Sequence, residues 1–90
     1  MYSKAKYVVG EILTHDITGS IFGAVVVSEA APHKAVEKLF VEGSIVGAGF
    51  FHYDDAAVYV YGESTGLRVK SRPEDAKPVA RAIAHPSVVT

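Results

Sequence analysis

Residues 44–53, Ser-Ile-Val-Gly-Ala-Gly-Phe-Phe-His-Tyr, decide how this 90-residue chain folds. Their β-branched and aromatic side chains predict a strand. Gly47 and Gly49 leave one face of that strand nearly without side chains, and such a face lets another segment approach the backbone closely. We therefore expect a helix or a second subunit to pack against the two glycines.

The segment before this strand, residues 32–42, has helical periodicity. One face would carry the apolar residues Ala35, Val36, Leu39 and Phe40. The opposite, solvated face would carry His33, Lys34, Glu37 and Lys38. This spacing predicts an amphipathic helix that ends at Gly43.

Two further strands are expected nearer the N-terminus. Residues 4–13 carry apolar side chains at both odd and even positions, which predicts a strand covered on both faces. Residues 14–20 have the composition of a turn, and residues 21–28 are rich in β-branched side chains. A hairpin is the simplest connection between the two strands.

The second half of the chain predicts a three-stranded meander. Its strands would be residues 44–53, 57–61 and 67–70. Turns are expected at Asp54-Asp55 and at residues 62–66. Tyr59 and Tyr61 would share one face of the middle strand, because side chains alternate along a strand.

A second helix is expected after the meander, because Ser71 and Glu74 have the spacing of a capping box. Its inward face would be Ala76, Val79, Ala80 and Ile83. Pro78 lacks an amide hydrogen, so we expect a tight turn followed by a helix that restarts near Pro78, or a kink. Pro86 would end the helix, and the last residues would form a tail or an edge strand.

These elements predict a single α+β domain over residues 1–90. About five mainly antiparallel strands would be covered by two helices on one face, in the order ββαβββα. A ferredoxin-like sandwich is the first arrangement to consider, and a profilin-like variant is the alternative. No linker, repeat or low-complexity segment interrupts the chain.

The composition is unusually apolar for a chain of this length. Hydrophobic residues make up 49% and charged residues 21%, and the mean hydropathy is +0.20. Small domains bury a modest share of their surface, and large exposed apolar patches usually mark interaction sites. We therefore expect a homo-oligomer that self-associates through the sheet.

The composition also excludes several classes of protein. The absence of cysteine excludes disulfides, cysteine zinc sites and iron–sulfur clusters, and a cytoplasmic location is compatible with it. No apolar run is long enough for a membrane span or a signal peptide. The formal net charge of −1 gives no reason to expect nucleic acid or an anionic membrane as a partner.

Residues 62–66, Gly-Glu-Ser-Thr-Gly, match the G-x-S-x-G nucleophile elbow. Asp75 and His85 follow in the serine, acid, histidine order of α/β-hydrolases. An elbow requires a helix directly after the turn, whereas residues 67–70 have strand character here. We interpret the segment as a turn that is rich in glycine, serine and threonine.

Two other stretches resemble known families. Residues 47–53 resemble the aromatic RNP1 strand of RNA-recognition motifs, which implies RNA binding by ring stacking. In that family the strand lies among basic residues, whereas Asp54 and Asp55 follow it here. Residues 24–60 resemble the DsrE sulfur-relay family, but persulfide transfer requires a thiol that this chain lacks.

The histidines are the side chains whose ordinary pKa lies nearest neutrality. They are His15, His33, His52 and His85. No pair has a metal-binding spacing, so no metal site is predicted. His52 is the most interesting of them because it lies among aromatic residues at a strand end.

A small anion-binding patch is a further candidate site. Arg68, Lys70 and Arg72 alternate beside the turn at residues 64–66, and arginine favours phosphate or carboxylate. The candidate ligand-binding residues are therefore His52, Asp54, Glu63, Ser64, Arg68 and Arg72.

Two hypotheses about function follow. The preferred one is a non-enzymatic oligomeric module that binds a ligand such as a small anion, or a protein partner, and has a regulatory or interaction role. The alternative is a small isomerase or hydrolase whose site lies at a subunit boundary around His52, Ser64 and Arg68. The sequence identifies no cofactor and no catalytic residue.

Overall fold

The computed structural model describes residues 3–14, 19–28, 30–53 and 57–84. The strands are β1 (Ser3–Leu13), β2 (Ser20–Val27), β3 (Gly47–Tyr53), β4 (Val58–Tyr61), β5 (Glu63–Ser64) and β6 (Val69–Lys70). The helices are the 3-10 helices η1 (His33–Leu39) and η2 (Pro73–Asp75) and the α-helix α1 (Ala76–Ala84). This is a small α+β fold, as the sequence predicts.

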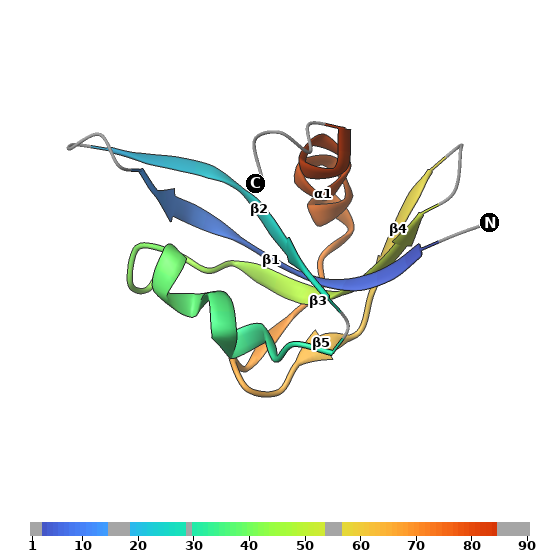
Figure 1. Ribbon diagram of the computed structural model, residues 1–90, viewed down its shortest axis with the longest axis horizontal. Coiled ribbons are helices and arrows are strands. Elements are labelled where there is room, and N and C mark those ends of the chain that lie inside the picture. Colours follow the sequence, from blue (N-terminus) through green and yellow to red (C-terminus); the bar gives the residue numbers. More distant parts are fainter. Residues whose placement is uncertain (1–2, 15–18, 29, 54–56, 85–90) are drawn as a thin grey trace.

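The main sheet has four strands in the order β2-β1-β3-β4, and every neighbouring pair is antiparallel (Figure 1). The expected hairpin between β1 and β2 is confirmed, and the Thr14 amide closes it by donating to the Gly19 carbonyl at 3.2 Å. The mainly antiparallel sheet is thus confirmed, but the ferredoxin-like or profilin-like arrangement is not.

The third strand of the expected meander does not join this sheet. β3 and β4 pair as expected, but β5 and β6 form a separate two-stranded sheet. The cause lies in the backbone, because Gly62 (φ 76°) and Arg68 (φ 59°) adopt left-handed conformations. Such conformations interrupt an extended strand and turn the chain away from β4.

The two helical regions lie on opposite faces of the main sheet, not on one face as expected (Figure 1). Tyr7 and Val9 face Val79 of α1, whereas Val8 faces Val36 of η1. Successive side chains of a strand point to opposite faces. Because β1 is apolar at both odd and even positions, each face of the sheet needs its own cover.

The first helix is a 3-10 helix and ends at Leu39, four residues before the predicted stop. It has about three residues per turn, so His33 and Val36 point the same way and both are buried. His33 was predicted on the solvated face, and this is wrong. Its Nε2 lies 2.7 Å from the carbonyl oxygen of Gly49, which satisfies the buried ring with a hydrogen bond.

The second helix begins as expected with a tight turn, because η2 leads directly into α1. Pro78 lies in the first turn of α1, where no amide hydrogen is needed. The cap is one residue later than predicted: the Arg72 amide donates to the Asp75 carboxylate at 2.9 Å. Val79 is buried, as expected, but Ala80 is exposed.

The close approach expected at the two glycines of β3 is confirmed, and the approaching segments belong to this chain. A Cβ atom on Gly47 would lie 2.6 Å from Oδ1 of Asp75, and one on Gly49 would lie 2.6 Å from the carbonyl oxygen of Tyr61. Real Cβ atoms essentially never show contacts this short. Glycine at these two positions therefore makes room for η2 and for the turn after β4.

Asp75 is fully buried and joins η2 to the sheet. Its Oδ2 accepts hydrogen bonds from the Tyr7 hydroxyl at 2.6 Å and from the Arg72 amide at 2.9 Å. Its Oδ1 accepts from Nε and Nη2 of Arg72 at 2.9 and 2.7 Å. Both carboxylate oxygens are thus compensated, as a buried charge requires.

Substitution of Gly47 by alanine tests this packing. We expect the free energy of unfolding to fall by about 1–3 kcal/mol, the usual cost of overpacking, because the methyl group would overlap the Asp75 carboxylate. Gly66→Ala is the matched control, since a Cβ there meets nothing within 4 Å. Urea unfolding of both variants measures the difference, and equal effects would contradict the proposed role of Gly47.

The alkaline stability of the protein tests the bond between Tyr7 and Asp75. Burial and the hydrogen bond to the Asp75 carboxylate raise the pKa of Tyr7 well above its ordinary value. Below about pH 10 the phenol is protonated in both the folded and the unfolded chain. Its hydrogen bond to Asp75 then contributes fully to the free energy of unfolding. Above about pH 10 only the unfolded chain loses this proton, which lowers stability by up to about 1.4 kcal/mol per pH unit.

Tyr7→Phe should therefore show a shallower loss of stability above pH 10 than the unsubstituted protein. Tyr59→Phe, which removes a hydroxyl from a side chain that is 47% exposed, should keep the original slope. Chemical denaturation between pH 9 and pH 11.5 gives the slopes. A Tyr7→Phe slope identical to that of Tyr59→Phe would contradict the expectation.

Candidate binding site on the aromatic face

Two cross-strand rows place lysine and aromatic residues on one face of the main sheet. In the first row, Phe50 lies between Lys6 of β1 and Tyr61 of β4. In the second row, His52 lies opposite Tyr59 of β4. Directly paired residues share a face of the sheet. We call the set Lys6, Phe50, His52, Tyr59 and Tyr61 the aromatic face.

The rings of the aromatic face form two stacked pairs that a tilted contact joins. Phe50 and Tyr61 are stacked with centroids 5.8 Å apart, and His52 and Tyr59 are stacked at 4.9 Å. His52 also lies 5.7 Å from Tyr61, which joins the two rows. Because each ring rests on its neighbour, the side chains are held in place before any ligand arrives.

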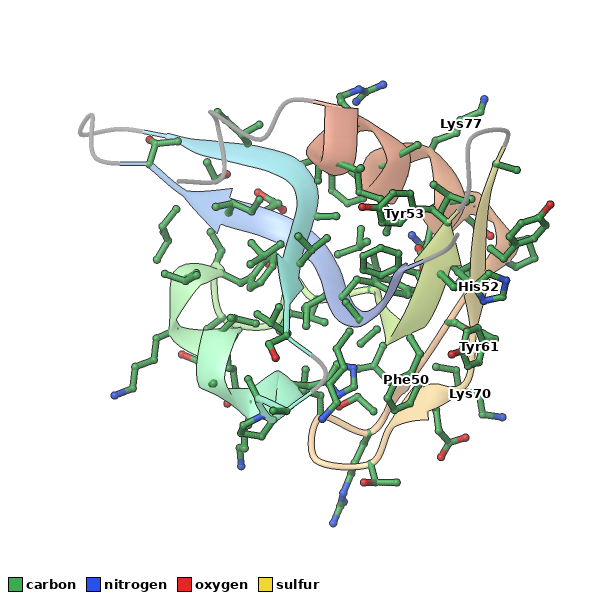
Figure 2. The ribbon with its side chains drawn as sticks, turned by 45° about the vertical axis from the view of Figure 1, so that its right-hand side comes forward. Phe50, His52, Tyr53, Tyr61, Lys70 and Lys77 are labelled. Atoms are coloured by element: carbon green, nitrogen blue, oxygen red, sulfur yellow. The ribbon has the colours of Figure 1, made fainter. Side chains whose placement is uncertain are left out.

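Much of this group is open to solvent. Tyr59 is 47% exposed and Tyr61 is 37% exposed, while Phe50 and His52 are half-buried. Figure 2 shows Phe50, His52 and Tyr61 together on one side of the molecule, with Lys70 beside them. An exposed aromatic group of this kind can contact a flat ring, and the tyrosine hydroxyls can form hydrogen bonds.

The charge near these rings is positive. Lys6 Nζ lies 5.9 Å from the centroid of Phe50 and donates a hydrogen bond to the Ala31 carbonyl at 2.8 Å. That bond fixes the ammonium group without neutralising its charge, since its acceptor is an uncharged carbonyl. No acidic residue occupies this face among the described positions of β1, β3 and β4. The face can therefore attract an anionic group.

The predicted site residues do not all come together. His52 belongs to the aromatic face, and Glu63 and Arg68 are exposed on the segment from β5 to β6. Ser64 is only 2% exposed, and its Oγ accepts a hydrogen bond from the Leu67 amide at 3.2 Å. Its geometry is that of a side chain that stabilises a turn. Asp54 lies outside the described residues.

Arg72 also has a different environment from the one expected. Its guanidinium group binds the buried Asp75 carboxylate, and Nη1 lies 3.7 Å from the Glu74 carboxylate. The positive charge that was expected in the anion patch is thus compensated within the chain. Arg68 and Lys70 remain exposed, but the left-handed backbone at Arg68 shows that it is not part of a strand.

Sequence reasoning missed the role of Lys6 and Phe50 in this face. The alternation of Tyr59 and Tyr61 was recognisable, and so was the aromatic character of β3. Only the strand register brings Lys6 opposite Phe50, however, because 44 positions separate them in the chain. The RNP1-like strand and the position of His52 among aromatic residues were the signals that pointed to this surface.

A second concave surface lies between η1 and β6. It has a volume of about 480 Å³, and its apolar lining comes mainly from Phe40, Ile45, Leu67 and Val69. Glu37, Lys38 and Glu42 add charges of both signs. None of the predicted site residues lines it.

Two other kinds of site can be assessed for the described part of the chain. Within it, no three histidine, aspartate or glutamate side chains are grouped closely enough to hold a metal ion. No helix there is both long and apolar enough to cross a membrane.

The aromatic face is therefore the best-formed candidate site, and its chemistry has to be argued from its own geometry. No family model, curated protein or solved structure matches this chain.

Proposed function

We propose that this protein is a non-enzymatic binding module whose aromatic face takes a small anionic ligand that carries a flat ring. The observation that carries the proposal is the pair of cross-strand rows, in which Phe50 lies between Lys6 and Tyr61 and His52 lies opposite Tyr59. The rings supply contact area for the flat part of the ligand, and Lys6 supplies charge for its anionic part. A cytoplasmic location remains a prediction from the absence of cysteine.

The energetics of the proposal rest on stacking. A base or similar ring that stacks on an aromatic side chain gains about 1–3 kcal/mol. Lys6 adds attraction for an anion, and this attraction weakens with salt because charges open to solvent are screened. The prestacked rings also lower the entropic cost of binding, because few rotamers remain to be fixed.

A binding function is favoured over the alternative of a small isomerase or hydrolase. That alternative relied on Ser64 and Arg68 acting with His52. The Ser64 hydroxyl is buried and already accepts a hydrogen bond from the Leu67 amide, so a substrate cannot reach it without opening the turn. We accordingly assign anion binding to Lys6 of the aromatic face instead of to Arg68 and Arg72.

An NMR titration tests the proposed function. Adenosine monophosphate and 4-hydroxybenzoate both combine a flat ring with an anionic group, and they distinguish a phosphate from a carboxylate ligand. We expect at least one of them to shift the amide signals of β3 and β4, and added salt to weaken its binding. Inorganic phosphate and uncharged adenosine should each bind much more weakly, because each lacks one of the two features.

Substitutions then locate the site. Tyr61→Ala should weaken binding about tenfold, in line with the loss of one stacking contact, whereas Tyr61→Phe should retain most of it because the ring remains. Lys6→Gln should also weaken binding, while Lys77→Gln on α1 serves as the control. The absence of binding by both probes at millimolar concentration, or equal binding to Tyr61→Ala, would contradict the proposal.

A further inference from the structure

In the part of the chain that the structure describes, the outer edge of β2 carries none of the lysines, prolines or bulges that protect many edge strands. β2 is eight residues long and lies at one end of the strand order, so only β1 pairs with it in the sheet. Its sequence, Ser-Ile-Phe-Gly-Ala-Val-Val-Val, contains no charge and no proline. Proteins commonly place lysine, proline or a bulge on an exposed edge to prevent pairing with other chains.

The strand register shows which backbone groups of β2 point outward. The Val9 and Glu11 carbonyls accept hydrogen bonds from the Val46 and Val41 amides, on the side of β1 away from β2. Backbone groups of successive residues point to alternate sides in an antiparallel ladder. The even-numbered residues of β1 therefore bond to β2, where their partners are the odd-numbered residues 21, 23, 25 and 27.

The even-numbered residues of β2 consequently direct their N–H and C=O groups away from the sheet. They are Ser20, Phe22, Ala24 and Val26. Among the described residues, no backbone hydrogen bond from outside the sheet engages these groups. Backbone groups in this arrangement are a template for another strand.

Exposed apolar side chains accompany this edge. Ile21 is 63% exposed, and Phe22 and Leu13 are each 54% exposed. All three lie at the outer end of the β1–β2 hairpin, which projects beyond the rest of the fold (Figure 1). A strand that paired with β2 would bring a second apolar surface against them.

We propose that a second copy of this chain pairs antiparallel with β2, so that the two sheets join into one of eight strands. The four outward residues are spaced symmetrically about Gly23: Ser20 and Val26 lie three positions away, and Phe22 and Ala24 lie one position away. A two-fold axis at Gly23 therefore pairs Ser20 with Val26 of the other copy and Phe22 with Ala24. This register uses all eight outward backbone groups of each strand.

A second copy suits this edge better than a charged partner does. A two-fold axis requires the edge to complement itself, and residues 20–28 carry no charge that would face a like charge. At the axis, Gly23 would face the Gly23 of the second copy in a pair without direct hydrogen bonds. Cα atoms in such pairs approach to about 4.5 Å, and glycine leaves that space clear.

Cysteine crosslinking tests the register. Gly23→Cys gives a protein with a single thiol, since the chain has no cysteine. The new Cβ would meet only Ile12 Cδ1, at an ordinary 3.6 Å. A Cα separation of about 4.5 Å lies within the range of disulfides, so oxidation by diamide should give a covalent dimer. Gly66→Cys is the control, because nothing lies within 4 Å of that position, and it should stay largely uncrosslinked.

Light scattering of the full chain gives an independent measurement. We expect a dimer mass at about 100 μM for the unsubstituted protein and a monomer mass for Phe22→Lys, with unchanged circular dichroism. Tyr59→Lys, on the opposite edge strand β4, should remain dimeric. A monomeric unsubstituted protein, or equal crosslinking of the two cysteine variants, would overturn the proposal. A dimer that Phe22→Lys leaves intact would overturn it as well.

Discussion

The buried carboxylate of Asp75 is the constraint on which the rest of the structure depends. A charge removed from water is tolerated only where it is paired and hydrogen-bonded. Here the compensating groups come from two distant parts of the chain, the Tyr7 hydroxyl on β1 and the Arg72 amide and guanidinium before α1. Gly47 provides the space that the carboxylate occupies. The position of α1 over the sheet is thus fixed by polar bonds as well as by apolar packing.

The same constraint organises the exposed surface. Gly47, Gly49 and Phe51 occupy the face of β3 that Asp75 and α1 cover. Because side chains alternate along a strand, Phe50 and His52 must then point to the other face. The segment from β5 to β6 and η1 cover the inner part of that face around Ala48. The rings further along the strand stay open to solvent. The candidate site therefore exists because the segments that cover the core do not extend over these rings.

Periodicity predicts the parts of this fold that depend on local pattern. It identifies the β1–β2 hairpin, the pairing of β3 with β4 and the turn before α1. It does not identify long-range partners, and this explains the errors. His33 was assigned to solvent because α-helical spacing places it opposite the apolar face, but the 3-10 helix turns it inward and the Gly49 carbonyl satisfies it there. The apolar pattern of β1 was recognised, yet the helices were assigned to one face. Likewise, only strand register reveals that Lys6 and Phe50 share a site.

The local distribution of charged and apolar side chains describes this protein better than its net charge and overall composition do. A formal charge of −1 does not show that the Lys6 ammonium group lies beside the Phe50 ring and donates to the uncharged Ala31 carbonyl. The apolar excess likewise does not lie on an open face of the sheet, because each face is covered by a helix. Large apolar side chains are exposed at both edges of the sheet, with tyrosines on β4 and the uncharged strand β2 opposite, and also at Leu39 and Val46. Since two strands, β1 and β3, lie between these edges, the ligand and the second copy would bind without competing for the same residues.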